Sequence, residues 1–357
     1  MKACVVGGGP AGLYAAKFLI ERGINTTLYE KETEVGGLYR YSLLPVSKMA
    51  PFARLLKDPN FEMKLNCPVD AELLGQLENG FDVFVIATGA GGPRIPDISG
   101  AEHCINGLDV IKSFWNGDDV RHQFSNNVLV IGMGNVSMDV VKVIFGSASK
   151  QSGHKIDSCI NTNNNIDANT KNITIISRGN AYNGAFSNSE LRSVLEIDDL
   201  QIVCSEGNNS SLSEQNRLQV LGVKRVLEWI KCIKEKIFKD TDHKWWERRK
   251  KMLTENRDGS RKLHMRFNTM IKSITKDEGK YRVAFERDGV ESNEIFDSVI
   301  CCMGFENART HKMMIKKPMF HVGWAKHPRG NVDGVKRDAH FTVMQIDQMN
   351  MNGHERE

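Results

Sequence analysis

The sequence predicts an α/β fold in which two domains of similar design share one chain, and two glycine-rich turns predict it. The first turn, over residues 5–12, reads VVGGGPAG, and the second, over residues 128–137, reads VLVIGMGNVS. Each turn follows a short apolar run and opens a segment whose apolar residues have helical spacing. A strand that leads through a glycine turn into a helix is typical of nucleotide-binding α/β domains. Two such turns therefore predict two Rossmann-like dinucleotide-binding domains.

Length and composition fit this organisation. The chain has 357 residues, of which 40% are hydrophobic and 26% charged, so two packed domains are expected. The formal net charge of +4 gives no reason to expect a nucleic-acid partner. No apolar run reaches the ~18 residues of a membrane span. We expect no transmembrane segment, and no presequence is visible before the first strand, which starts at Lys2.

The first turn carries the G-x-G-x-x-G pattern at Gly7, Gly9 and Gly12. Gly7 allows the tight turn, Gly9 lets the backbone approach a pyrophosphate, and Gly12 lets the helix pack close to the strand. The pyrophosphate would then lie on the N–H groups at the helix N-terminus, where the helix dipole favours its charge. The turn is therefore predicted to bind the first dinucleotide.

A second strand over residues 26–30 ends in the acid Glu30. It lies about 20 residues beyond the glycine turn, where a carboxylate accepts hydrogen bonds from a ribose. The alternative is a glycine-rich turn followed by an unrelated surface glutamate. A later strand over residues 81–90 completes the expected first sheet.

The second turn has Ser137 where the first has its third glycine, and such a residue moves the helix away from the strand. The strand over residues 173–177 is followed by Arg178, which can bind a 2′-phosphate. These two features favour NADP(H) over NAD(H). The alternative for Arg178 is an ordinary solvated charge. Since two dinucleotides in one chain usually mean a flavin and a nicotinamide, the expected cofactors are FAD and NADP.

The cysteines indicate neither a dithiol nor a metal site. The chain has eight cysteines, none in a C-x-x-C pair, and no His/Cys cluster has zinc spacing. The adjacent Cys301 and Cys302 are interpreted as residues of a buried strand rather than as a redox pair. No metal and no catalytic acid or base are predicted.

The order of the motifs predicts a discontinuous arrangement. Residues 1–110 and 295–357 are expected to form the FAD-binding domain, and residues 111–294 an NADP-binding domain inserted into it. The strand over residues 281–286 and the turn over 287–289 belong to the inserted part.

Six short motifs, in the same order, resemble the adrenodoxin reductase family of ferredoxin–NADP+ reductases. Besides the first turn they are YEK with GLYRY, FWNG, GNVSMDV, RG with AFSNSELR, and GWAK, at residues 29–41, 114–117, 134–140, 178–192 and 323–326. The resemblance implies NADPH as electron donor, FAD as carrier and an acidic [2Fe–2S] ferredoxin as partner. It also implies a role in iron–sulfur assembly or a related electron chain, a mitochondrial or mitochondrion-related location, and a monomer.

The resemblance also implies roles for individual residues. Contacts with FAD are implied for Ala11, Glu30, Leu38, Trp324, Gly330, Asn331 and Val332. Contacts with the NADP pyrophosphate are implied for Met133, Gly134, Asn135 and Val136. Arg178 would bind the 2′-phosphate, and Glu190 would lie at the nicotinamide end. The alternatives are a partly buried anchor for Trp324 and a helix-surface charge for Glu190.

Three features depart from the family pattern. Ser47 stands where the family has a histidine, Ser177 replaces the first arginine of a pair, and the segment between Phe305 and Val322 is short. A degenerate nucleotide-binding subunit without turnover is therefore one alternative. A module like the small subunit of glutamate synthase is another, although the Cys-rich segments that it predicts are absent from the sequence.

The most basic run, over residues 244–251, has two interpretations. It is either a solvated helix face or part of a docking surface for an acidic protein. In the second case Arg248 and Arg249, or Arg192, would face the ferredoxin.

Overall fold

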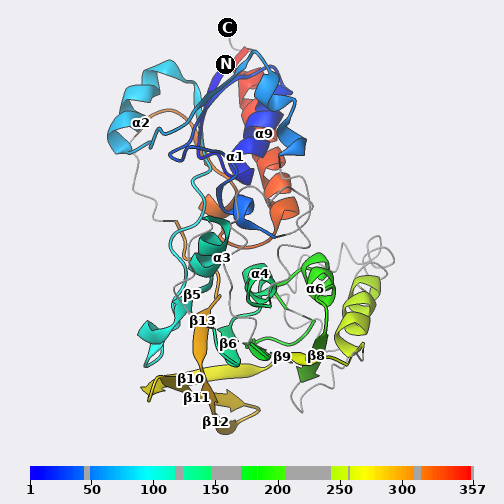
Figure 1. The fold of residues 1–357 in the computed structure, drawn as a ribbon. Coiled ribbons are helices and arrows are strands. Elements are labelled where there is room, and N and C mark those ends of the chain that lie inside the picture. The colour runs from blue at the N-terminus through cyan, green and yellow to red at the C-terminus, as the bar shows by residue number, and fades with distance from the viewer. Residues whose placement is uncertain are drawn as a thin grey trace. The chain divides into compact units, whose positions relative to one another are not determined.

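The computed structural model of the chain describes residues 1–43, 49–116, 124–145, 170–182, 184–205, 243–255, 258–308 and 315–354. The chain divides into two compact units (Figure 1). The first unit consists of Met1–Ser42, Val46–Arg94 and Gly304–Glu357, and the second of Leu43–Pro45 and Ile95–Met303. The second unit is therefore an insertion in the first. No helix in the described ranges combines the length and apolar character needed to cross a membrane.

The first unit is built on a five-stranded, fully parallel sheet with the order β14-β4-β1-β2-β3. Its strands are β1 (Lys2–Val6), β2 (Asn25–Tyr29), β3 (Phe61–Lys64), β4 (Val83–Ile86) and β14 (Met319–His321). Its helices are α1 (Pro10–Ile20), α2 (Ala71–Leu77) and α9 (Val332–His354), with short turns η1 (Gly37–Tyr41), η2 (Ala50–Phe52), η3 (Leu55–Lys57), η4 (Glu78–Gly80) and η7 (Gly323–Ala325).

Both faces of this sheet are buried, as expected for a parallel sheet. Ala3 and Val5 of β1 pack with α1 and α9 on one face, while Cys4 and Val6 pack with Leu74 of α2 on the other. Figure 1 shows α1 and α9 side by side. The last described helix thus completes the core that the first helix begins.

The second unit contains a six-stranded, fully parallel sheet with the order β5-β13-β6-β7-β9-β8. Its strands are β5 (Ile105–Asn106), β6 (Asn127–Ile131), β7 (Asn172–Ile176), β8 (Leu200–Ser205), β9 (Arg261–Arg266) and β13 (Ser298–Cys301). Its helices are η5 (Ala101–His103), α3 (Gly107–Asn116), α4 (Asn135–Ile144), α6 (Asn188–Leu195) and a helix over residues 243–254.

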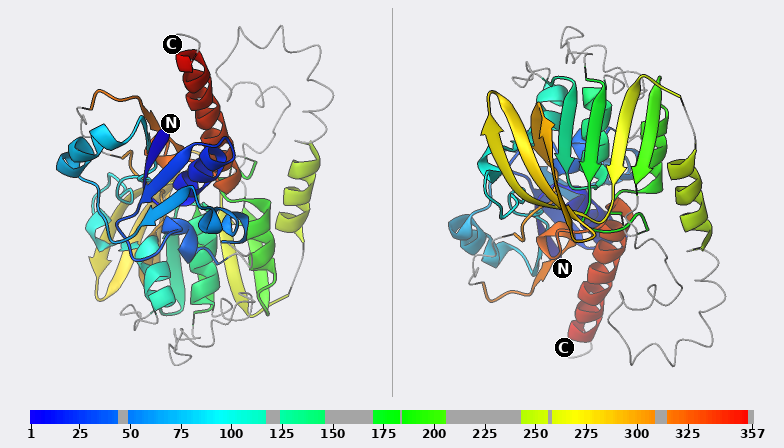
Figure 2. Two further views of the ribbon diagram at one scale, coloured as in Figure 1. Left: turned by 90° about the horizontal axis from the view of Figure 1, so that it is seen from above. Right: turned by 90° about the horizontal axis from the view of Figure 1, so that it is seen from below.

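A three-stranded antiparallel sheet packs on this larger sheet and closes its core. It consists of β10 (Thr269–Asp277), β11 (Lys280–Arg287) and β12 (Val290–Phe296). Val283 and Phe285 of β11 pack against Leu129 of β6 and Val299 of β13. Figure 2 shows the parallel strands with this smaller sheet beside them. The predicted α/β fold is confirmed: each unit is built on a parallel sheet, and the second unit is inserted into the first.

The two ends of the insertion lie outside the interval 111–294 that the sequence indicated. The insertion extends from Ile95 to Met303 because β5 pairs with β13, and β13 pairs with β6, in the second sheet. The strand β5 has only two residues, too few to show a periodicity in the sequence.

Candidate functional site

The first glycine turn has a backbone shape that only glycine can adopt. Gly7 has a φ of 106°, and a Cβ there would lie 2.4 Å from the carbonyl oxygen of Ala87. A Cβ on Gly12 would lie 1.9 Å from the carbonyl oxygen of Gly7. These contacts let α1 start directly against β1 and β4. The roles predicted for Gly7 and Gly12 in turn geometry and helix packing therefore fit the structure.

Gly9 differs from the other two glycines of the pattern. It is the N-cap of α1, in an extended conformation and without a side-chain cap, and a Cβ there would have no atom within 4 Å. No protein contact requires a glycine at this position. The open space lies over the N–H groups of the helix N-terminus, where a phosphate is favoured.

Glu30 lies directly on this turn. It is 6% exposed, its Oε2 accepts a hydrogen bond from the Gly8 N–H at 2.5 Å, and its Oε1 accepts one from the Glu32 N–H at 2.9 Å. The surface-charge alternative is wrong, because Glu30 is buried. Each carboxylate oxygen has a second lone pair for a ribose hydroxyl.

The segment that begins at Gly36 covers the same turn. The Gly36 N–H donates to the Gly8 carbonyl at 2.7 Å, and a Cβ on Gly37 would lie 3.2 Å from the Cα of Gly9. Leu38 follows in η1 and is 37% exposed. Leu38 thus follows directly on Gly37, which packs against Gly9, while its contact with FAD stays a prediction.

The segment from η7 to α9 adds the remaining predicted FAD contacts. A Cβ on Gly323 would lie 2.6 Å from the Cβ of Ala11, so η7 touches the first turn of α1. Asp338 on α9 accepts a hydrogen bond from the Gly323 N–H at 2.7 Å. Gly330 has a φ of 89°, and the Asn331 side chain accepts from the Gly334 N–H at the start of α9, where Val332 is the first residue.

Trp324 has a feature that points to a ligand. Its indole Nε1 is buried and has no hydrogen-bond partner among the described residues. Its ring packs 5.4 Å from that of Phe305. A buried indole N–H normally finds an acceptor. The orphaned donor and the open space at Gly9 both fit a bound FAD in the first unit.

The second glycine turn repeats this design with one change. Gly132 has a φ of 101°, and a Cβ there would lie 2.4 Å from the Cys302 carbonyl oxygen, whereas a Cβ on Gly134 would meet nothing within 4 Å. Ser137 donates from its Oγ to the Gly132 carbonyl at 2.8 Å and accepts from the Gly134 N–H at 3.2 Å. The serine therefore ties the turn together, a role that its size alone did not reveal.

A segment over residues 184–187 lies along this turn. Ala185 forms a β-bridge with Gly134, and the Ser187 N–H donates to Asn135 Oδ1 at 2.8 Å. Met133 is buried, and Val136 is half-buried in the first turn of α4. Of the four residues predicted for the pyrophosphate, Gly134 and Asn135 thus contact this segment directly.

Arg178 lies on the same side of the sheet. It follows β7, is exposed, and stands beside the glycine turn, since the Gly132 N–H donates to the Ile176 carbonyl at 3.1 Å. The Ser177 hydroxyl accepts a hydrogen bond from the Gly179 N–H at 3.1 Å. Arg178 is therefore exposed beside the second glycine turn, and its binding of a 2′-phosphate stays a prediction.

Glu190 is part of a buried charge cluster with Asp139 and Lys142. It is 2% exposed, and Lys142 Nζ lies 2.9 Å from its Oε2 and 2.6 Å from Asp139 Oδ1. Burial lowers the pKa of Lys142, but the two carboxylates outweigh this effect and the pKa is raised. The surface-charge alternative for Glu190 is wrong. The spacing of Asp139 and Lys142, three residues apart on α4, was the signal for this cluster.

Arg249 does not belong to a docking surface. Its side chain is 0% exposed and donates to main-chain carbonyls, so it cannot meet a partner protein. The prediction that it faces a ferredoxin is wrong, because Arg249 is the one buried residue in the otherwise mostly exposed run over 244–251. Arg192 and Arg248 are exposed.

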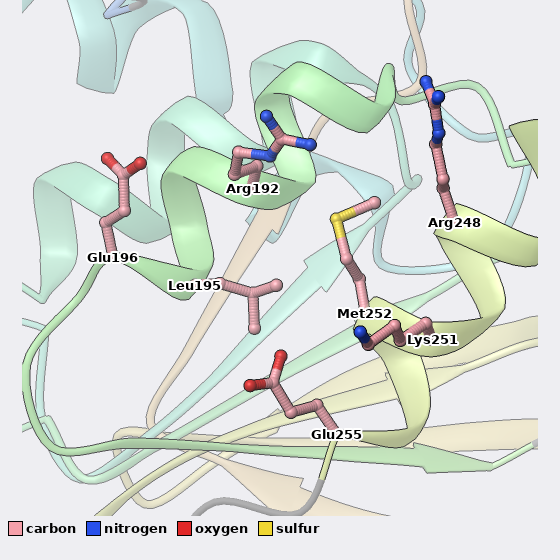
Figure 3. Close-up of a pocket in the computed structure, with 7 residues that line it drawn as sticks. All are labelled: Arg192, Leu195, Glu196, Arg248, Lys251, Met252 and Glu255. Carbon is pink, nitrogen blue, oxygen red and sulfur yellow. The ribbon is translucent and has the colours of Figure 1, made fainter.

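These two exposed arginines line a shared hollow of about 300 Å³. Figure 3 shows Arg192 on α6 and Arg248, Lys251 and Met252 on the helix over 243–254 around it. Leu195, Glu196 and Glu255 complete the lining. The lining thus combines three basic, two acidic and two apolar side chains.

The remaining features predicted from the sequence concern thiols and missing ligands. Cys301 ends β13, and the pKa values of Cys301 and Cys302 are both raised by burial, which keeps the thiols protonated and unreactive. The described residues hold no group of three or more His, Cys, Asp or Glu side chains arranged for a metal. Ser47, which replaces the family histidine, and Gly117 of the FWNG motif lie outside the described residues.

Comparisons with known proteins agree with this geometry. The pyridine nucleotide-disulphide oxidoreductase family matches residues 1–181. The chain is 26% identical over 208 residues to cindoxin reductase of Citrobacter braakii, covering 55% of this chain and 45% of that protein. It is 27% identical over 236 residues to a probable mitochondrial NADPH:adrenodoxin oxidoreductase of Dictyostelium discoideum, covering 60% and 45%. The chain thus spans less than half the length of these two relatives.

A solved structure shows the same fold over nearly the whole chain. FprA of Mycobacterium tuberculosis in complex with NADPH superposes with a TM-score of 0.74 at 18% sequence identity. The match covers 99% of this chain and 85% of FprA.

Proposed function

The chain belongs to the pyridine nucleotide-disulphide oxidoreductase family, whose members bind FAD and NADP(H), and from this premise we propose that it passes electrons from NADPH through FAD to a [2Fe–2S] ferredoxin. The observation that carries the proposal is the pair of glycine turns at Gly9 and Gly134, each with open space at its second glycine. One turn belongs to each unit. The relatives named as adrenodoxin and cindoxin reductases support the electron acceptor.

In this proposal each residue binds or orients a cofactor, and none is a catalytic acid or base. Bound flavin supplies the conversion of a two-electron donor into one-electron steps. Gly9 and Glu30 hold the pyrophosphate and ribose of FAD, and the Trp324 indole N–H donates to it. Gly134 receives the NADPH pyrophosphate, while Glu190, held by Lys142, lies at the nicotinamide end.

We further propose that the protein acts in iron–sulfur assembly or a related electron chain, as a monomer. The mitochondrial name of the Dictyostelium relative supports a location in a mitochondrion or a related organelle. Fractionation of the source cells with a tagged full-length chain tests the location.

The proposal is tested by an anaerobic titration of the purified protein with NADPH and then NADH, followed by flavin absorbance. Bleaching at a lower concentration of NADPH than of NADH, followed by reoxidation on adding a [2Fe–2S] ferredoxin, is expected. Flavin that stays oxidised contradicts the proposal. A protein that neither contains nor takes up FAD would instead be the degenerate subunit.

The preference for NADPH is expected to depend on Arg178. A charge-assisted contact contributes about 1.5–3 kcal/mol, so Arg178→Ser should raise the dissociation constant of NADPH about 10- to 100-fold and leave that of NADH unchanged. Lys171→Ser is the matched control, because Lys171 is an exposed cation just before the same strand. Equal losses for both nucleotides in Arg178→Ser would show that the residue does not bind the 2′-phosphate.

The hollow between Arg192 and Arg248 is expected to guide the ferredoxin. Arg192→Glu with Arg248→Glu should slow ferredoxin-dependent cytochrome c reduction, and added salt should slow the wild type in the same assay. Flavin reduction by NADPH should be unchanged in both experiments. Lys262→Glu, an exposed change on β9, is the control. A reversal that leaves cytochrome c reduction at its wild-type rate and salt dependence would argue against this docking site.

A further inference from the structure

We propose that Arg249 is a positioning residue for the dinucleotide site of the second unit. Its guanidinium holds the segment over residues 184–188 in the shape that supports the glycine turn at Gly134. The inference rests on the proposed function, in which this turn receives a nicotinamide dinucleotide. Arg249 itself touches none of the residues expected to contact the dinucleotide, so its effect is carried by the segment.

Arg249 lies on the helix over residues 243–254 and reaches five acceptors, three of them in this segment. Nη1 donates to the carbonyls of Ala181, Tyr182 and Gly184 at 3.2, 3.3 and 3.1 Å, Nη2 donates to the carbonyl of Phe186, and Nε donates to Asn188 Oδ1 at 2.9 Å. Three nitrogens in a rigid plane thus hold acceptors at residues 181, 182, 184, 186 and 188. A flexible point charge could not do this, because its donors do not form a planar fork.

Two aromatic rings fix the guanidinium in turn. Its central carbon lies 4.2 Å from the ring centroid of Phe186 and 4.1 Å from that of Trp245. Trp245 also accepts a hydrogen bond on its carbonyl from the Asn188 side chain at 3.1 Å. Arg249 is therefore held both by the hydrogen bonds of its nitrogens and by the stacking of its planar guanidinium on two aromatic rings.

The acceptors of Arg249 carry no formal charge. They are four main-chain carbonyls and one amide. Burial lowers the pKa of Arg249 to about 10, which still leaves it protonated at neutral pH. Within the described ranges no carboxylate pairs with Arg249, and a buried cation of this kind is costly to keep. Arg249 therefore acts on the described residues through the geometry of its hydrogen bonds rather than through charge pairing.

The segment in turn contacts the glycine turn at Gly134 and the start of α6. Ala185 bridges Gly134, and Ser187 uses its N–H on the Asn135 side chain and its hydroxyl on the Glu190 N–H. Each of these contacts comes from a residue between two acceptors of Arg249. Without the guanidinium, the bridge to Gly134 and the cap of α6 lose their support together.

The test measures the dissociation constant of NADP+ in the FAD-loaded full-length protein. Arg249→Lys is expected to raise it at least tenfold with unchanged FAD content, because the first glycine turn lies in the other unit. Asn188→Ala, which removes one acceptor, is expected to raise it severalfold. Lys250→Met, an exposed neighbour on the same helix, is the matched control. Guanidinium ion added to Arg249→Ala is expected to restore binding in part.

Hydrogen exchange of the Ser187 amide gives a second readout that needs no nucleotide. It should be slow in the wild type and at least tenfold faster in Arg249→Lys. Unchanged exchange, or NADP+ binding equal to wild type in a variant of lower melting temperature, would overturn the inference and leave only a structural role. A wild type that binds FAD but no NADP+ would instead overturn the proposed function.

Discussion

Lys142→Met is expected to lower the free energy of unfolding of the second unit by about 3–5 kcal/mol. The change leaves Glu190 and Asp139 buried without the cation that lies 2.9 and 2.6 Å from them. An uncompensated buried charge costs far more than the burial of a methionine returns. Urea unfolding followed by tryptophan fluorescence and circular dichroism measures the effect.

The dependence on pH gives this prediction a second test. Because the pKa of Lys142 is raised in the folded protein, its contribution is complete below about pH 10.5 and is lost as pH rises through the folded value. The wild type should therefore lose stability at strongly alkaline pH through a step that Lys142→Met lacks.

Two variants serve as controls for Lys142→Met. Lys250→Met, at an exposed site, should change stability by no more than about 0.5 kcal/mol. Combining Lys142→Met with Asp139→Leu and Glu190→Met should recover much of the loss, because an apolar trio replaces a buried ionic one. A Lys142→Met protein as stable as wild type would show that the cluster is open to water.

Gly9→Ala is expected to remove FAD without harming the fold. An added methyl group meets no protein atom within 4 Å, and the backbone at Gly9, with φ of −69°, suits alanine. The apoprotein should be unchanged or more stable by up to about 1 kcal/mol. The methyl group would fill the space of the pyrophosphate at a cost of about 1–3 kcal/mol, which corresponds to about 5- to 150-fold weaker binding of FAD.

Gly12→Ala provides the contrast. Its methyl group would lie 1.9 Å from the Gly7 carbonyl oxygen, so the apoprotein itself should unfold at a lower temperature. Gly75→Ala in α2, where a Cβ also meets nothing, should change neither property for the worse. FAD titration by fluorescence quenching and thermal unfolding of the apoproteins separate the three variants. Wild-type FAD affinity in Gly9→Ala would place the pyrophosphate elsewhere.

The sequence predicted the fold because its signals are local. A strand, a glycine turn and a helix adjoin in the chain, so the segments at Gly7 and Gly132 identify their own structure. The positions of Glu30 and Arg178 follow from parallel neighbours, since β1 and β2, and β6 and β7, pair in register. The strand β5 could not be predicted, because a strand of two residues shows no periodicity.

The parts that the sequence could not predict depend on contacts between distant segments. Arg249 bonds to carbonyls more than sixty residues away, and a carbonyl has no signature in a sequence. The charged run over 244–251 predicted a solvated helix face, yet Arg249 within it is buried. The sequence equally allowed Glu190 to be a helix-surface charge, because its pairing with Lys142 joins segments that are far apart in the chain.

The insertion of the second unit sets an order for synthesis on the ribosome. The second sheet is complete once Cys301 has emerged, whereas the first sheet waits for β14, which pairs with β4, and for α9, which packs on α1. The nascent first unit therefore exposes an open sheet edge and an uncovered α1 while the whole insertion is translated. The first unit is therefore completed only after the insertion, although the glycine turn predicted to bind FAD precedes the insertion in the chain.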